Sequence, residues 1–230
     1  MSRLILAIDQ GTGGTKAVLF DEQGHIAAKG FCPLASYYPM PGYVEQEPSE
    51  IYDNVICAVR LCLEQAVKED PSTPDRVACA GISNQRETFV VWDDSGSLLH
   101  PALVWQDKRA VDICNRFKGT PLETDVRNKT GLIIDPYFSG SKLTWLGEND
   151  ASVKKAVASG KALFGTVDSW LLYKLTKGES YFTDYTNASR TLLFNINTLE
   201  WDESLKKSFG VEAILFPEAT PSTHHFGNTT

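Results

Sequence analysis

The first hydrophobic segment of the chain runs from Leu4 to Ile8 and ends abruptly at Asp9. An apolar run without polar alternation predicts a strand buried on both faces of a sheet. A second run at residues 17–20 predicts a strand that returns beside the first, and residues 25–35 predict a third strand after a turn at residues 21–24. We therefore expect the chain to begin with three strands in an antiparallel meander.

Residues 48–68 have the apolar spacing of a helix, and Pro48 suits its first position. The apolar residues that recur at this spacing are Ile51, Val55, Ile56, Val59, Leu63 and Ala66. The preceding residues 37–47 contain Pro39, Pro41 and Gly42 and predict a surface loop. A nearly continuous apolar run within residues 76–83 then predicts a central strand covered on both faces.

The remaining chain predicts shorter elements. Strands are expected at residues 89–92, 98–105 and 162–166, and helices at residues 108–117, 122–129, 139–146, 153–158 and 170–175 and after Trp201. The polar run at residues 183–190 and the residues from Pro217 onward predict loops. Three meander strands followed by helix, strand and helix are typical of an α/β fold of the ribonuclease-H type. We expect a mixed five-stranded sheet with flanking helices, in one large domain or two small ones.

The turn after the first strand contains Gly11, Gly13 and Gly14. Glycines have access to positive φ and bring backbone N–H groups close to an anion, so the turn could bind phosphate, with Asp9 holding a magnesium ion beside it. An ordinary hairpin turn is the alternative. A Walker A loop and a dinucleotide fingerprint both lead into a helix, whereas these glycines lead into a second strand. What remains is a β-turn-β phosphate site of the kind found in actin-like and sugar-kinase ATPases.

Composition and charge limit the partners, the compartment and the metal sites that we expect. The net charge of −7 and the pI near 5.1 disfavour nucleic acid or an anionic membrane as the main partner. No apolar run approaches the length of a membrane span, and the first strand leaves no room for a signal peptide, so we expect a cytoplasmic protein. The five cysteines lack a Cys-x-x-Cys pair, which predicts buried free thiols, and the histidine spacing disfavours a structural zinc site.

Three further positions carry candidate chemistry. Arg86 and Glu87 follow a predicted strand and could together satisfy two neighbouring hydroxyls of a polyol, although an exposed ion pair is the commoner arrangement. Trp105 also ends a strand and could pack on the carbon backbone of a small ligand, with core packing as the alternative. Pro136 stiffens the backbone before Tyr137, whose hydroxyl would point in a fixed direction, with plain aromatic packing at a helix start as the alternative.

These segments occur in one order along the chain. They are Asp9-Gln10-Gly11-Thr12, Asn84-Gln85-Arg86-Glu87-Thr88, Val104-Trp105-Gln106, Asp135-Pro136-Tyr137-Phe138-Ser139-Gly140, Gly165-Thr166-Val167-Asp168-Ser169-Trp170 and the run 183–190. In this order they resemble the glycerol kinases of the carbohydrate-kinase family. The resemblance implies an actin-like ATPase fold and the ATP-dependent phosphorylation of glycerol to glycerol 3-phosphate.

The resemblance also assigns residues. It implies that Arg86, Glu87, Trp105 and Tyr137 line the glycerol pocket. It further implies ATP and Mg²⁺ as cofactors and a homo-oligomer for the full-length protein.

In the turn, the resemblance implies that Thr12, Gly13, Gly14 and Lys16 face the nucleotide phosphates, with Asp9 near the magnesium ion. This chain departs from the family here. Glycerol kinases usually carry Thr-Ser where it has Gly13-Gly14, and often Arg where it has Lys16. The backbone donors are retained, but the side-chain hydroxyl contacts to the nucleotide are lost.

A second departure concerns the general base. Phosphoryl transfer needs a carboxylate that accepts the hydroxyl proton, and in glycerol kinases it belongs to a Gly-Asp-Gln motif beyond Thr230. Residues 1–230 therefore resemble an amino-terminal substrate-binding domain, with the carboxy-terminal nucleotide-binding domain absent and no kinase activity expected alone. The alternatives are a kinase for another polyol or sugar, and a non-catalytic actin-like ATP-binding module that is complete in 230 residues.

Overall fold

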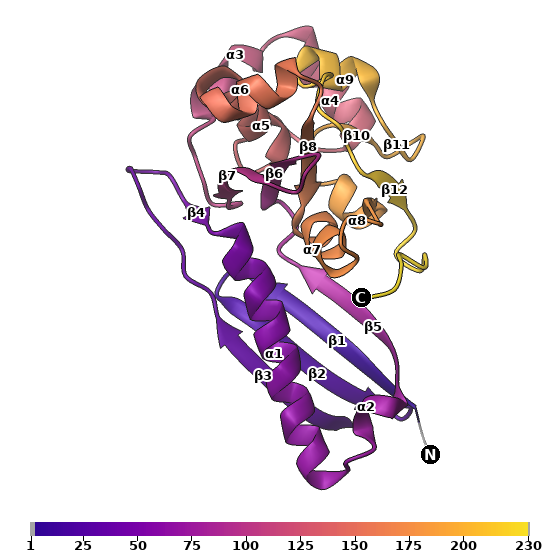
Figure 1. Ribbon diagram of the computed structural model, residues 1–230. Coiled ribbons are helices and arrows are strands. Elements are labelled where there is room, and N and C mark those ends of the chain that lie inside the picture. Colours follow the sequence, from indigo (N-terminus) through magenta and orange to yellow (C-terminus); the bar gives the residue numbers. More distant parts are fainter. Residues whose placement is uncertain (1–2, 230) are drawn as a thin grey trace. The chain divides into compact units, whose positions relative to one another are not determined.

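The computed structural model describes residues 3–229, which form two compact units (Figure 1). Of these residues, the first unit contains those up to Ser36 together with Gln46–Gln85. The second unit contains Tyr37–Glu45 and the residues from Arg86 onward.

The first unit is built on a mixed sheet of the strands β1 (Leu4–Gly11), β2 (Gly14–Asp21), β3 (Ile26–Pro33) and β5 (Val77–Asn84). Their order is β3-β2-β1-β5. The three meander strands pair antiparallel, and β5 pairs parallel with β1. The expected meander and mixed sheet are confirmed, but the sheet has four strands in the described residues instead of the predicted five.

One long helix, α1 (Pro48–Glu69), packs on β2 and β3 (Figure 1), and the short α2 (Thr73–Arg76) follows it. Helix α1 confirms the prediction for residues 48–68 to within one residue. Its approach to β3 is close, because a Cβ on Gly30 would lie 2.2 Å from the carbonyl oxygen of Ala58. A side chain larger than that of glycine at this position would separate helix from strand.

Two burial predictions for this sheet are wrong. In β1 burial alternates, so that Leu4, Leu6 and Ile8 are buried while Ile5 is 46% exposed. Strand β5 lies at the sheet edge and is exposed over most of its length. The reason is that α1 covers only one face of the sheet in the described residues, and an apolar run in the sequence does not reveal what covers it.

The cysteine prediction is also partly wrong. Cys32 on β3 and Cys57 on α1 form a disulfide, which the close packing of these two elements brings together. Cys79 is free but exposed on the edge strand. Only Cys62 and Cys114 are the buried free thiols that the sequence led us to expect, and burial raises the pKa of both.

The second unit contains a sheet of order β4-β7-β6-β8. Its strands are β4 (Glu45–Gln46), β6 (Phe89–Asp93), β7 (Leu98–Leu103) and β8 (Ala162–Thr166). Strand β6 and its neighbour β8 at the sheet edge are almost completely buried and contribute Phe89 and Phe164 to the core, with ring centroids 5.4 Å apart. The predicted strands at residues 89–92, 98–105 and 162–166 are confirmed.

Helices surround this sheet (Figure 1). They are α3 (Val111–Phe117), α4 (Pro121–Thr130), α5 (Ser139–Asn149), α6 (Ala151–Ala158), α7 (Val167–Leu175) and α9 (Glu203–Ser208). All lie where the sequence predicts helices, with bounds that differ by a few residues.

The predicted loop at residues 183–190 is wrong. The segment contains β9 (Phe182–Asp184) and α8 (Tyr185–Ala188), because Asp184 accepts a hydrogen bond from the Asn187 backbone N–H at 2.8 Å and thereby caps the helix. Strand β9 pairs with β12 (Glu218–Thr220), which lies in the second predicted loop. The short strands β10 (Phe194–Asn195) and β11 (Glu200–Trp201) complete the unit.

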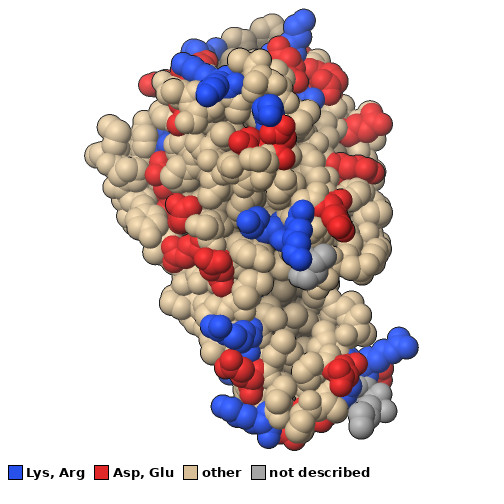
Figure 2. All heavy atoms as spheres, in the orientation of Figure 1, with Lys and Arg blue, Asp and Glu red and all other residues tan. Residues whose placement is uncertain are grey.

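Neither unit has a helix that is long and apolar enough to cross a membrane, as far as residues 3–229 are concerned. On the face drawn in Figure 2, basic and acidic side chains are interspersed over the surface of each unit.

Candidate functional site

The turn between β1 and β2 is tight. Gly11 pairs with Gly14, so that Thr12 and Gly13 alone connect the two strands. Gly14 has a φ of +152°, and a Cβ there would lie 2.6 Å from the carbonyl oxygen of Cys32. Gly13 is exposed and a Cβ there would meet nothing within 4 Å. The two glycines therefore differ: the close approach of β3 leaves no room for a side chain at position 14, whereas position 13 has room for one.

Buried glutamines form hydrogen bonds with the turn and with one another. Gln46 donates to the carbonyl oxygen of Thr12 at 2.8 Å, and the Thr12 hydroxyl donates to Gln85 at 3.2 Å. Gln85 in turn donates to Gln46 at 2.8 Å and to Gln10 at 3.3 Å. Because these amides are buried and mutually hydrogen-bonded, the backbone of the turn is held in one conformation.

Asp9 and Lys16 lie opposite one another on β1 and β2. Their carboxylate and ammonium groups are 3.9 Å apart, and both side chains are more than half exposed. A contact of this kind contributes little to stability, so both charges are available to a ligand. An exposed carboxylate, a cation and the backbone of a glycine turn thus occur together in the first unit.

The second unit brings Trp105 and Tyr137 together. Their ring centroids are 5.5 Å apart with planes tilted by 60°, and both side chains are half-buried. They line a cavity of about 320 Å³ with Gln106, Asp107, Lys108, Asp135 and Pro136. Because each ring is only partly covered, the pair presents apolar surface at this cavity.

Glu87 lies close to this pair through Arg190. The Arg190 Nε donates to Glu87 Oε1 at 2.7 Å, and its guanidinium carbon lies 6.0 Å from the Tyr137 ring centre and 5.0 Å from that of Phe138. The partner of the buried Glu87 is thus a residue far along the chain, and the alternative of an exposed ion pair with Arg86 is wrong. Arg86 itself is exposed.

The backbone groups of Glu87, Trp105 and Tyr137 each form a hydrogen bond with a neighbouring side chain. The Thr88 hydroxyl accepts from the Trp105 N–H at 3.2 Å, and Asp135 accepts from the Tyr137 N–H at 2.8 Å. Ser139, at the start of α5, donates its hydroxyl to the carbonyl oxygen of Glu87 at 3.0 Å. We call Glu87, Trp105, Tyr137 and Arg190 the aromatic–carboxylate cluster.

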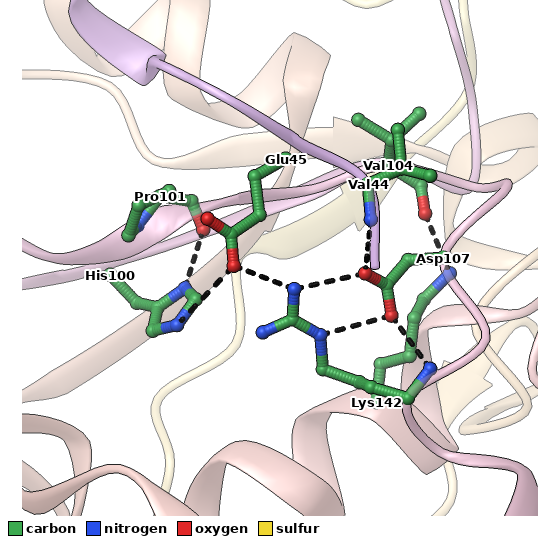
Figure 3. A network of polar contacts seen from close by, with 8 residues as sticks. Val44, Glu45, His100, Pro101, Val104, Asp107 and Lys142 are labelled. Carbon is green, nitrogen blue, oxygen red and sulfur yellow. Dashed lines mark hydrogen bonds and ion pairs between the residues drawn. The ribbon is translucent and has the colours of Figure 1, made fainter. Parts of the chain in front are cut away.

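The second unit also contains a network of ion pairs and hydrogen bonds (Figure 3). Arg109 donates to both carboxylate oxygens of Asp107 at 3.0 and 2.9 Å and to Glu45 at 2.6 Å. Burial lowers the pKa of Arg109, but the hydrogen bonds that it donates to these two carboxylates more than offset this effect, and the pKa lies above its usual value. Asp107 also accepts from the Val44 N–H at 2.7 Å. The network therefore fastens the segment before β4 to the segment after β7.

Another carboxylate, that of the half-buried Asp168, lies at the start of α7. It accepts hydrogen bonds from the hydroxyls of Thr166 at 2.5 Å and Thr183 at 2.7 Å. Burial raises the pKa of Asp168 to about 6, although these hydroxyl contacts act in the opposite direction. The group ties β8, α7 and β9 together and lies apart from the aromatic–carboxylate cluster in the contacts described.

The sequence matches the FGGY family of carbohydrate kinases, N-terminal domain, over residues 4–230. The chain belongs to this family. It is 45% identical over 227 residues to a glycerol kinase of Citrifermentans bemidjiense and 45% identical over 226 residues to glycerol kinase 1 of Thermotoga maritima, in both cases over 98% of this chain. A crystal structure of Plasmodium falciparum glycerol kinase with ADP is similar over the whole chain, with a TM-score of 0.88 and 34% identity.

This FGGY domain spans 45% of the length of these relatives. The gluconate kinase of Lactobacillus acidophilus, with a TM-score of 0.85 at 23% identity, shares the fold. The expected actin-like α/β architecture is therefore confirmed.

Sequence reasoning missed several residues around the site of the FGGY domain. In the sequence Arg190 is only part of a polar run, and no local pattern assigns a role to Ser139 or Thr88. Their contacts connect positions 103, 52 and 17 residues apart, which no local pattern reveals. A local pattern does single out Lys142, because it places a lysine on the apolar side of a predicted helix.

Proposed function

We propose that this chain is the amino-terminal substrate-binding domain of an ATP-dependent glycerol kinase whose carboxy-terminal part binds the nucleotide. The reaction transfers the γ-phosphoryl group of ATP to a terminal hydroxyl of glycerol and yields glycerol 3-phosphate. The observation that carries the proposal is the aromatic–carboxylate cluster, in which Glu87 accompanies two half-buried rings beside a cavity.

The cluster has the chemistry that a small polyol requires. Hydroxyl groups both donate and accept hydrogen bonds. The contact with Arg190 uses Oε1 of Glu87, so the second carboxylate oxygen would accept from a substrate hydroxyl, and Arg86 would donate to a neighbouring one. Trp105 and Tyr137 would cover the carbon chain of the polyol.

The turn of the first unit suits the phosphates of ATP. The backbone of residues 12–14 and the ammonium group of Lys16 would bind the phosphate oxygens. Mg²⁺ commonly keeps several waters and takes only one or two carboxylates, so the exposed Asp9 fits as its ligand. The ion would neutralise charge on the transferred phosphoryl group.

The hydroxyl proton requires a carboxylate acceptor. Since Glu87 would bind the substrate, we assign the general base and the adenine pocket to the remainder of the protein. Closure of the two domains would exclude water as a competing acceptor. The proposal includes a homo-oligomeric full-length protein in the cytoplasm, where ATP is available.

The test is an assay of ADP release by the full-length protein with glycerol, erythritol or xylulose. We expect glycerol to be used best. Substitution Arg86→Ala should lower kcat/KM for glycerol by about 10²-fold, because a hydrogen bond to a charged group is lost. The exposed Arg127 on α4 provides a matched control, and Arg127→Ala should have no effect.

Each other outcome rejects part of the proposal. Equal kinetics of Arg86→Ala and the wild-type protein would reject the pocket assignment. A preference for xylulose or erythritol would make the protein a kinase of another polyol or sugar. Nucleotide binding without turnover of any polyol would favour an ATP-binding module, and turnover of glycerol by residues 1–230 alone would contradict the assignment of the base.

A further inference from the structure

Lys142 on α5 is completely buried, yet its side chain ends in an amine. Its Nζ donates to the carbonyl oxygen of Val104 at 3.2 Å and to that of Tyr137 at 3.1 Å. Val104 directly precedes Trp105. One side chain therefore holds the backbone of both aromatic residues of the cluster.

The energetics show that Lys142 does more than fill space. A methionine of similar length would fill the same volume without the cost of burying an amine. What it would not provide is a donor for the two carbonyl groups, and a buried acceptor without a donor is costly. The retained amine is explained by these two hydrogen bonds, which fix two segments from different parts of the chain.

Ser139, one turn before Lys142 on α5, also contacts the backbone of a cluster residue. Ser139 and Lys142 are three residues apart and share one helix face, and the hydroxyl of Ser139 donates to the carbonyl oxygen of Glu87. The start of α5 thus contacts the backbone at Glu87, Val104 and Tyr137. These segments provide Glu87, Trp105 and Tyr137, three of the four residues of the cluster.

We propose that Lys142 is a positioning residue of the polyol pocket, which sets the separation of Trp105 and Tyr137 through the carbonyl groups of Val104 and Tyr137. The inference rests on the proposed function for its kinetic consequence. The effect of Lys142 on the surroundings of Trp105 is measured without an enzymatic assay.

The charged and titratable groups around Lys142 come from several elements. Asp107, close to Val104 in Figure 3, and Glu87 favour the ammonium form, while Arg109 disfavours it, and Cys114 on α3 faces it as well. Burial outweighs the carboxylates and lowers the pKa of Lys142 to about 7. Protonation near neutral pH thus changes the strength of both hydrogen bonds.

The experiment compares Lys142→Met with Lys155→Met, an exposed lysine on α6, in the full-length protein. We expect Lys142→Met to raise KM for glycerol about tenfold or more while KM for ATP changes less than twofold, because a displaced pocket weakens the bound polyol. In protein labelled with 5-fluorotryptophan, the ¹⁹F resonance assigned by Trp105→Phe should shift, and that of Trp201 should not. Lys155→Met should change neither quantity.

Lys142→Gln keeps amide donors without a charge and should restore part of the glycerol KM. If neither variant folds, the wild-type protein decides, since the Trp105 resonance should titrate with a midpoint near the pKa of about 7 while that of Trp201 does not. An unchanged Trp105 resonance in Lys142→Met, or its failure to titrate, overturns the inference. A wild-type protein that phosphorylates no polyol rejects the proposed function instead, and the NMR result still stands or falls by itself.

Discussion

Arg190 and Glu87, 103 residues apart in the sequence, form an ion pair with Nε and Oε1 2.7 Å apart. The carboxylate is the more buried partner, with 6% of its side chain exposed against 27% for the arginine. Because the carboxylate is the more buried of the two, the role of Arg190 is to compensate the buried charge of Glu87 and to orient this carboxylate beside Tyr137.

Substitution Arg190→Met should therefore destabilise the second unit and impair the pocket. We expect the free energy of unfolding to fall by about 1–3 kcal/mol, because a buried carboxylate loses its donor. Denaturant unfolding measures this loss, and kcat/KM for glycerol should fall in the same variant. Arg127→Met, at an exposed position of α4, is the control, and equal stability of the two variants would contradict the role assigned to Arg190.

The glycine turn leads to a second prediction. A Cβ on Gly13 meets nothing within 4 Å, so Gly13→Ser should leave stability unchanged and restore a hydroxyl that glycerol kinases usually carry. A new hydrogen bond to a nucleotide phosphate would lower KM for ATP about three- to tenfold. The control is Gly147→Ser on α5, which also points into open space. If Gly13→Ser raises KM for ATP or leaves it unchanged, the turn does not face the phosphates.

The meander, helix α1 and most elements of the second unit follow from local patterns. Apolar spacing and Pro48 define α1, and the β1-turn-β2 hairpin is encoded by two apolar runs around glycines. These features depend on neighbours along the chain, which is why a single sequence predicts them.

The wrong predictions concern contacts between residues that are far apart in the sequence. The exposure of Ile5 and of β5 depends on which elements cover the sheet, and an apolar run does not specify them. The partner of Glu87 and the buried position of Lys142 likewise depend on contacts between distant segments. The polarity of residues 183–190 predicts a loop, whereas the polar side chain of Asp184 caps a helix.

The disulfide gives a third prediction. In protein purified without reductant, peptide mapping after alkylation of the unfolded chain should find Cys32 and Cys57 linked and Cys62, Cys79 and Cys114 labelled. Reduction or Cys57→Ser should lower the stability of the first unit by about 3 kcal/mol, because the bond closes a loop with a sequence separation of 25 residues. Cys79→Ser, which removes an exposed free thiol, should leave stability unchanged. Labelling of all five cysteines would show that the pair is not formed.

The last prediction concerns the pH dependence that Asp168 imparts. Its pKa is raised from 3.8 to about 6 in the folded protein, so between these values the folded state holds a proton that the unfolded state has released. The contribution of Asp168 to stability is therefore fully present below about pH 4 and is lost as the pH rises to about 6.

Asp168→Asn removes this ionisation and keeps an oxygen that accepts from the Thr166 or Thr183 hydroxyl. Compared with this variant, the wild-type protein should lose about 1.4 kcal/mol of unfolding free energy for each pH unit within that range. Denaturant unfolding of both proteins at several pH values measures the difference, with Asp125→Asn on the exposed side of α4 as the control. A difference that stays constant between pH 4 and 6 would mean that Asp168 is ionised throughout, and that the hydroxyls of Thr166 and Thr183 outweigh the cost of its burial.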